Sequence, residues 1–581
     1  MIGLNKIGLN QVQLNRLHLN APFPAYGKMA GGGGSGDGFP QLPGDVTRWH
    51  FGGLTNEMMA AMDDPRIEDA DHKGRFLSFK NFAWKGMSGV NGYVQNFNYF
   101  RNNATVDKVR IDEQSSNSIK VTLLTSGMGH VIYIPKDIYQ FNKSYFIKIS
   151  SEGYNEGDLS LSFYASSVST ATTVKVPLNP NGITEIPAIK EDDFLAVYLF
   201  NAAGKVGSIT IEQLPLYPGF ILGDGVDDFA VTEKELNFED TYTVYTAFIP
   251  FQNNPARNMI LCGADSKKTF SMQYSSLVYV SFIAGNNYYI NADFVNGLNL
   301  FACKRNGNNI CIKNLLTNKV VTGTCGDWVE NAGLYYLWKN ATYASFARAG
   351  IAGQIIDNGH FTTDEEDENI LNWHKKQYPW LFPDQAWTVT GKTNEDEDRA
   401  TIANITGNGN DLVLSNFGFA EGSGYNEEGE YAGYLVTDGV DDKVQSSSFT
   451  MNEDWTIVGD WELLSNVQIN CGIVKAQNVY LYNIANGLLI SINNPRSLQS
   501  FGTKSLHAIC SDGRLYDRNW VEYEYTVDQN FAIVESSLNI GFNLNNYTQI
   551  AFKNLGIYNN QILSKDDCIK AYNYLQTLKA K

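Results

Sequence analysis

One segment of the chain occurs twice, and this duplication limits the folds that are open to it. GFILGDGVDDFA, beginning at residue 219, returns as GYLVTDGVDDKV at residue 433, so Asp224 and Asp438 differ by 214 positions (438 minus 224). A strand-like run follows each copy after a similar interval, at Tyr242 and at Trp455. The chain is therefore expected to contain two copies of one domain.

Each copy also carries the same turn and helix signals. CKRNGNNICI and ICSDGRLY place Asn-Gly or Asp-Gly between apolar flanks, which predicts a hairpin. Each copy ends with a strand-like run, a turn and a short helix, which begins with capping-box spacing at Thr363 with Glu366 and at Ser564 with Asp567. The order of elements is the same in both copies.

A third match locates an insertion in the first copy. GRFLSFKNFAWKGMSG at 74 aligns with GNDLVLSNFGFAEGSG at 409, an offset of 335 (409 minus 74). The first copy therefore holds 121 residues (335 minus 214) that the second lacks, between about 92 and 217. Alternating runs such as SIKVTLL predict that the insertion is a further β-sandwich. The strand near 76–82 is expected to join the first sandwich across the insertion, and 412–417 to join the second.

The short strands, turn signals and element order resemble the concanavalin A-like lectin/glucanase jelly roll, specifically its laminin-G-like variety. The resemblance covers about residues 219–377 and 401–581, and it implies two sheets packed face to face in each copy. The expected fold class is all-β: tandem jelly-roll β-sandwiches, an inserted β-sandwich, an N-terminal repetitive anchor and a few short helices. The predicted parts are a pentad-repeat anchor (1–21), a Gly/Pro-rich linker (22–45), a lead-in segment with the first strand of sandwich one (46–91), the inserted β-sandwich (92–217), laminin-G-like jelly roll one (218–382), an acidic linker (383–400) and laminin-G-like jelly roll two (401–581).

The anchor consists of four pentads, IGLNK, IGLNQ, VQLNR and LHLNA. A period of five fits neither a helix nor a plain strand, but it fits short extended pieces separated by turns, as in one coil of a solenoid. A single coil cannot bury its own apolar side. The segment is therefore expected to attach the protein to another chain, through the repeated positions Leu4, Leu9, Leu14, Leu19, Asn5, Asn10, Asn15 and Asn20. A disordered terminus is the alternative.

Charge and cysteine content exclude several classes of function. The formal net charge is -18 and the chain has no basic run, so nucleic acid is an unexpected partner. The sequence shows no signal-peptide pattern and no apolar run near 18 residues, so membrane insertion is not expected and the protein is expected to be made and folded in a cytoplasm. Seven cysteines without CxxC pairs indicate reduced thiols, and only Cys303 and Cys311 are placed to face each other across a hairpin.

The acidic residues predict no catalytic site. Glucanases of this fold need two carboxylates on opposite sides of the glycosidic bond, whereas the run at 363–370 is typical of a helix start and the run at 393–400 of a solvated linker. The chain is therefore expected not to be an enzyme and to need no cofactor. Calcium is a possible ligand of the duplicated aspartates, and turn hydrogen bonding is the favoured alternative. These residues are Asp224, Asp227, Asp228, Asp438, Asp441 and Asp442.

Aromatic clusters are the candidate carbohydrate contacts. Tyrosine and tryptophan rings can stack on the apolar faces of sugars, and rings that fill the sandwich core are the favoured alternative. The candidate glycan-stacking residues are Tyr288, Tyr289, Tyr335, Tyr336 and Trp338.

Tandem lectin-like sandwiches behind a repetitive anchor resemble the fibre and appendage proteins of phages that infect Bacteroidales. That resemblance implies a virion head or tail fibre, a homo-oligomer with a trimer favoured, whose N-terminus contacts other virion proteins and whose sandwiches contact host surface glycans. The alternatives are a structural virion component that binds no sugar, a capsular polysaccharide depolymerase of concanavalin A-like glucanase type, and a bacterial surface adhesin.

Overall fold

The computed structural model describes residues 38–580 with gaps. The gaps are 106, 166–171, 192–193, 252–257, 263–269, 275–276, 285, 294–296, 329–330, 340–345, 430, 465–470, 477–478, 485–486, 493–498, 502–505, 526–533, 541, 544–545 and 548. The pentad anchor, with all its predicted contact residues, lies outside the described residues.

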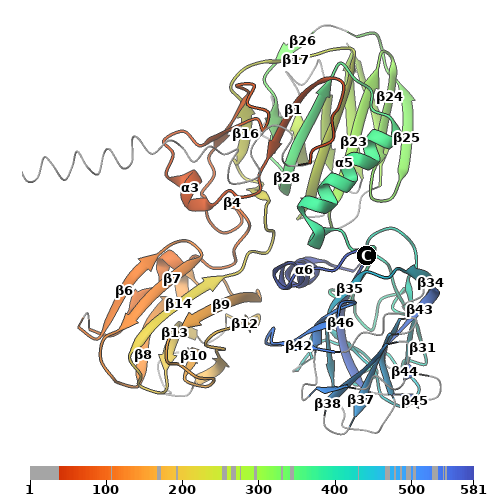
Figure 1. The fold of residues 1–581 in the computed structure, drawn as a ribbon. Coiled ribbons are helices and arrows are strands. Elements are labelled where there is room, and N and C mark those ends of the chain that lie inside the picture. Colours follow the sequence, from red (N-terminus) through yellow and green to blue (C-terminus); the bar gives the residue numbers. More distant parts are fainter. Residues whose placement is uncertain are drawn as a thin grey trace, which may run out of the picture.

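The first copy is a sandwich of two antiparallel sheets (Figure 1). One sheet runs in the order β25 (Lys319–Thr324), β24 (Asn309–Asn314), β23 (Asn299–Asn306), β18 (Thr241–Pro250), β28 (Arg348–Asn358), β15 (Ile221–Asp224) and β4 (Gly89–Val90), and β1 (Asp45–His50) also pairs with β28. The other runs β2 (Arg66–Glu68), β3 (Phe76–Lys80), β16 (Phe229–Thr232), β27 (Tyr336–Leu337), β19 (Asn258–Cys262), β20 (Phe270–Tyr274), β21 (Val278–Ala284) and β22 (Asn286–Ala292). A small separate sheet pairs β17 (Leu236–Phe238) with β26 (Asn331–Gly333).

The second copy repeats this strand order. Its first sheet runs β42 (Glu522–Glu524), β41 (Arg514–Asp517), β40 (Leu506–Cys510), β35 (Trp455–Leu463), β46 (Ile550–Asn559), β33 (Tyr434–Val436) and β32 (Gly424–Asn426), and β29 (Gln385–Thr388) also pairs with β46. Its second runs β30 (Thr401–Ile402), β31 (Leu412–Ser415), β34 (Lys443–Met451), β43 (Val534–Ile540), β36 (Cys471–Ala476), β37 (Val479–Ile484), β38 (Gly487–Ile492) and β39 (Gln499–Phe501). β44 (Phe542–Asn543) pairs with β45 (Asn546–Tyr547). The all-β fold class expected from the sequence is confirmed.

The predicted first strands join both sandwiches. β3 pairs with β16, with Lys80 opposite Phe229, and β31 pairs with β34, with Leu412 opposite Ser446. The insertion replaces a hairpin loop. In the second copy β32 and β33 pair across a short loop, and in the first copy the equivalent strands β4 and β15 pair directly although the insertion separates them in sequence.

The insertion forms two five-stranded antiparallel sheets. One runs β11 (Thr172–Pro177), β10 (Leu159–Ala165), β13 (Phe194–Asn201), β8 (Gly129–Pro135) and β5 (Arg101–Asn102), and the other β12 (Ile183–Ile186), β9 (Tyr145–Ser151), β14 (Gly207–Gln213), β7 (Ser118–Leu123) and β6 (Val109–Gln114). Alternation builds the core between them. In β7, for example, Ile119, Val121 and Leu123 are buried and the residues between them are half-buried.

Three α-helices lie in the described residues: α3 (Asn56–Ala60), α5 (Asp364–Gln377) and α6 (Lys565–Thr577). The capping box of Thr363 and Glu366 begins α5 as predicted. At α6 the Ser564 hydroxyl accepts from the Asp567 N–H and donates to the Asp567 carboxylate at 2.7 Å. No described helix has the length and apolar character needed to cross a membrane.

Two details differ from the sequence-based predictions. Part of the acidic linker, 383–400, belongs to the second sandwich, because β29 pairs with β46 and Trp387 is completely buried. Cys303 and Cys311 do not face each other, because the hairpin register places Cys303 opposite Ile312 and Cys311 opposite Lys304. Successive strand residues point to opposite faces, so the two thiols are on different sides of the sheet.

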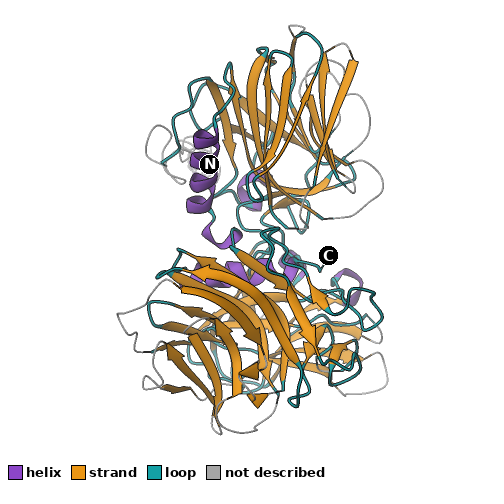
Figure 2. Ribbon diagram, turned by 90° about the vertical axis from the view of Figure 1, so that its right-hand side faces the viewer, coloured by secondary structure: helices purple, strands orange, loops and turns teal. Residues whose placement is uncertain are grey.

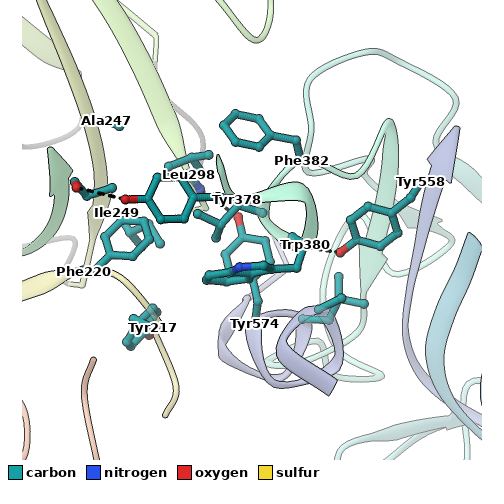
Figure 3. Close-up of a cluster of buried hydrophobic side chains, with 14 of the residues drawn as sticks. Tyr217, Phe220, Ala247, Ile249, Leu298, Tyr378, Trp380, Phe382, Tyr558 and Tyr574 are labelled. Atoms are coloured by element: carbon teal, nitrogen blue, oxygen red, sulfur yellow. Dashed lines mark hydrogen bonds between the residues drawn. The ribbon is translucent and has the colours of Figure 1, made fainter. Parts of the chain in front are cut away.

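The three sandwiches adjoin one another, with helices lying where they meet (Figures 1 and 2). A cluster of buried apolar side chains fills this junction and includes residues of α6 and of the turn η3 (Pro379–Leu381). Figure 3 shows this cluster, in which the Tyr558 hydroxyl donates to the Trp380 carbonyl at 2.8 Å. The Tyr574 hydroxyl accepts from the Leu298 N–H at 2.9 Å, which joins α6 to the first sandwich. Phe146 of the insert meets the Tyr572 ring edge-on at 5.2 Å. The sandwiches therefore form one body.

Candidate functional site

A row of side chains crosses one outer face of the inserted sandwich. The register places Lys175 opposite Ser162, Ser162 opposite Tyr198, Tyr198 opposite Tyr133 and Tyr133 opposite Arg101. The row therefore runs across all five strands from β11 to β5. We call these five residues the aromatic row.

Strand alternation explains why the rings of the aromatic row point outward. Val197 and Leu199 belong to the core of the insert, so Tyr198 between them is on the opposite face of β13. Tyr133 is likewise preceded and followed by the buried residues Ile132 and Ile134. Both tyrosines are half-buried, which leaves part of each ring exposed to solvent.

The two tyrosine rings form a platform. Their centroids are 5.5 Å apart and their planes differ by 27°, so they present neighbouring faces of similar orientation. His130 lies 4.6 Å from the Tyr198 ring and 5.1 Å from the Phe200 ring, and burial lowers the pKa of His130. The imidazole is therefore mainly neutral at pH 7 and extends the platform without adding charge.

Polar groups border this platform. Lys175 and Arg101 are exposed at the two ends of the row, and the Lys175 ammonium also lies 5.6 Å from the Phe200 ring. Ser162 is 1% exposed, so a small buried hydroxyl separates Lys175 from Tyr198. A flat apolar surface bordered by hydrogen-bond donors suits a ligand with an apolar face and a polar rim.

The aromatic residues that the sequence suggested are placed differently. Tyr335 and Trp338 are completely buried in the first sandwich, so they fill its core and cannot stack on a sugar. Tyr336 is half-buried beside Phe229. Tyr288 and Tyr289 lie on β22, but their side chains are outside the described part of the structure. Sequence reasoning missed Tyr133 and Tyr198, although each stands at the non-core position of an alternating strand.

The duplicated aspartates form matching turns. In the first copy, Asp224 accepts from the Val226 N–H at 2.7 Å and Asp228 accepts from the Asp224 N–H at 3.0 Å. In the second, Asp438 and Asp442 make the equivalent bonds, both at 2.7 Å. The turn hydrogen bonds that the sequence favoured are therefore present in both copies.

Each turn also gathers three carboxylates whose oxygens lie within 4.8 Å of one another. Oxygen ligands of this kind suit Ca²⁺, so calcium binding by Asp227 or Asp441 with their neighbours stays the untested alternative. Burial raises the pKa of Asp228 to about 7 and that of Asp442 to about 6. Carboxyl groups with these pKa values are partly protonated near neutral pH, which reduces the negative charge available to bind a cation.

The acidic run at the start of α5 has a structural role. Asp367 is 1% exposed and forms ion pairs with Lys304 at 2.6 Å and Lys313 at 3.1 Å. It also accepts from the hydroxyls of Tyr245 at 2.8 Å and Thr362 at 3.0 Å. These bonds hold α5 on the sheet and occupy the Asp367 carboxylate with structural partners.

Cavities lie at the junctions between packed modules in the described part of the chain. One of about 70 Å³ lies between α5, α6 and the segment around Phe382, and it is much smaller than typical ligand sites. The other, of about 440 Å³, has a size typical of such sites and is bordered by all three sandwiches. Neither the residues that line the larger cavity nor those of the aromatic row include an acid.

The chain as described is an all-β protein of three sandwiches, two of which are copies of one another. No protein-family model matches it, and no curated protein matches it in sequence.

Among solved structures, several binding domains of botulinum neurotoxins are similar to parts of this chain. That of serotype D is 11% identical with a TM-score of 0.26, and that of mosaic serotype C/D is 10% identical with a TM-score of 0.27; both matches cover 60% of this chain and 89% of the other. A third structure comes from botulinum neurotoxin type C, whose cell entry depends on interaction with two ganglioside molecules. It is 9% identical with a TM-score of 0.25, and the match covers 57% of this chain and 86% of the other. Identities and TM-scores this low carry no argument about the function of this chain.

Proposed function

We propose that the chain is a non-enzymatic carbohydrate-binding protein that contacts host surface glycans through the aromatic row of the inserted sandwich. The observation that carries the proposal is the pair of partly exposed, similarly oriented rings of Tyr133 and Tyr198. The C–H groups of a sugar ring carry partial positive charge and pack on the negative faces of aromatic rings, while sugar hydroxyls bond to polar neighbours.

The surroundings of the row support binding without hydrolysis. Glycoside hydrolysis uses two carboxyl groups that flank the scissile bond, and the row contains none. The insert contacts the rest of the chain through its other sheet, where Phe146 on β9 meets α6. This arrangement leaves the row on the opposite side of the insert, where a long polysaccharide can lie across the strands.

We further propose that the protein is a phage virion component, a head or tail fibre or another appendage. The sequence supports this proposal through its pentads, whose apolar positions need a partner for burial, and through the glycine-rich connector that follows them. In this proposal the N-terminus attaches to other virion proteins, the chain forms a homo-oligomer and the three sandwiches project toward the host.

An array of bacterial surface polysaccharides probed with the full chain tests the proposed binding. We expect saturable binding to at least one polysaccharide, and a loss of affinity of at least tenfold in Tyr198→Ala and in Tyr133→Ala, equivalent to about 1.4 kcal/mol. Tyr431→Ala is the matched control, because it removes another half-buried tyrosine, outside the insert, and should leave binding unchanged. Binding that none of these substitutions alters would contradict the proposed site.

The same preparation separates binding from catalysis. Incubation with each bound polysaccharide should release no new reducing ends. Sustained release that a single Asp or Glu substitution abolishes would instead favour the depolymerase alternative.

A further inference from the structure

The larger cavity lies where the three sandwiches meet, and each of them contributes a cation to its wall. Lys143 comes from the insert, Arg348 from β28 of the first sandwich and Lys579 from the C-terminal segment that follows α6. These three residues are separated by hundreds of positions in the sequence. Only the packing of the three modules brings them to one cavity of about 440 Å³.

None of the three cations has a carboxylate within ion-pair distance in the described part of the chain, although Asp224 is the strand-register partner of Arg348. Lys143, Arg348 and Lys579 form no ion pair and no side-chain hydrogen bond with another described residue, and no acid lines the cavity. In a protein with a formal net charge of -18, this is a local concentration of unpaired positive charge. Like charges around one cavity repel one another, and a bound anion would turn that repulsion into attraction.

The wall around Arg348 is held in place. The Arg348 carbonyl accepts from the Tyr274 hydroxyl at 2.7 Å and from the Phe251 N–H at 3.2 Å. The rings of Phe251 and Tyr217 lie 4.8 Å apart, and both line the cavity. Burial raises the pKa of Tyr217 to about 12, so this tyrosine stays neutral and can donate its hydroxyl proton. A guanidinium on such a fixed strand suits a planar carboxylate, which it can bind with two parallel bonds.

Much of the rest of the lining is apolar, as at Met87, Val94 and Ile249. A compact inorganic anion would leave these walls without a partner. A ligand that combines one carboxylate with a ring of sugar size would use both the cations and the apolar walls.

We propose that this cavity binds a carboxylate-bearing sugar residue, such as a uronic or sialic acid of an acidic glycan. The proposal rests on the proposed glycan-binding function and adds a second site, separate from the aromatic row. The proposed site also depends on the packing of the three sandwiches, because one bound sugar acid would contact all of them.

Ligand-observed NMR titrations of the full chain test this proposal with D-galacturonate, N-acetylneuraminate, neutral D-galactose and inorganic sulfate. D-galactose is the matched neutral probe, because it differs from D-galacturonate only in carrying a hydroxymethyl group where the acid has its carboxylate. We expect at least one of the two acids to bind saturably in the millimolar range, without measurable binding of D-galactose in the cavity. Arg348→Gln should weaken the acid at least tenfold, and Lys143→Gln and Lys579→Gln should each weaken it several-fold.

Lys190→Gln is the control variant, since Lys190 is exposed on the insert and its replacement changes the net charge equally. The exposed positions Lys143 and Lys579 keep the test decisive if Arg348→Gln fails to fold. Absence of binding by both acids, or binding that the three cavity substitutions leave unchanged, overturns the proposal. Displacement by sulfate at equal concentration also overturns it and defines an inorganic-anion site.

The two sets of variants distinguish acid binding in the cavity from acid binding at the aromatic row. If Tyr198→Ala abolishes acid binding and the cavity variants do not, the acid binds at the row, so the cavity proposal is wrong while the proposed function stands. If the acids bind in the cavity but no polysaccharide binds on the array, the cavity is an anion site and the proposed glycan-binding function is wrong.

Discussion

Replacing Asp367 by alanine should destabilise the first sandwich strongly. The substitution leaves Lys304, whose side chain is 4% exposed, without its counterion, and it removes the acceptor of the Tyr245 hydroxyl. Lys313 keeps a second partner in Asp364 at 2.6 Å. Removing one member of a buried ion pair costs about 3 to 5 kcal/mol. For a domain of this size the melting temperature should fall by roughly 6 to 20 °C.

The second sandwich supplies the matched rescue. Thr243 lies opposite Lys304 in the first copy, and Thr456 lies opposite Cys510 in the second. Asp367 and Cys568 each stand four residues after the helix N-cap, at Thr363 and Ser564. The buried thiols of Cys510 and Cys568 therefore occupy the places of the ion pair.

A double variant, Lys304→Cys with Asp367→Cys, should recover most of the lost stability under reducing conditions, because apolar replacement of a buried pair is often close to neutral. Urea unfolding and calorimetry of the full chain measure both variants. Asp364→Ala is the control, since its side chain is 94% exposed and its ion pair should contribute no more than about 1 kcal/mol. The reasoning is refuted if Asp367→Ala unfolds like this control, or if the double variant is no more stable than Asp367→Ala.

Two further predictions concern pH and the anchor. Burial raises the pKa of Asp228 to about 7 and that of Asp442 to about 6, so the folded chain binds these protons more tightly than the unfolded chain, and their contribution to the free energy of unfolding should rise as the pH falls from about 8 to 4. The lowered pKa values of the buried His374 and His507 act in the opposite direction. The test therefore compares the free energy of unfolding of the parent with that of the double variant Asp228→Asn plus Asp442→Asn at each pH. Equal slopes of this free energy against pH in the two proteins would contradict the prediction. A chain that begins at residue 40 should melt cooperatively but fail to enter virus particles, and normal incorporation would disprove the anchor.

Much of the architecture could be predicted from local patterns. The two Asp-Gly-Val-Asp-Asp segments identified a duplication, and the unequal offsets located the insertion, because homologous strands keep their order along the chain. The hairpins after Asn306 and Cys510 and the start of α5 followed from turn and capping residues, whose conformational preferences act over a few positions. The sequence alone thus determined the fold class and the equivalence of the two copies.

The candidate sites depended on tertiary structure. The aromatic row draws on five strands between Arg101 and Tyr198, and strand register alone decides that Tyr133 meets Tyr198. The sequence also drew attention to Trp338 and Tyr335, which the core absorbs, because a cluster of rings has the same composition whether it faces the core or solvent. Register, face and module packing are set by contacts between distant residues, and a local pattern does not contain that information.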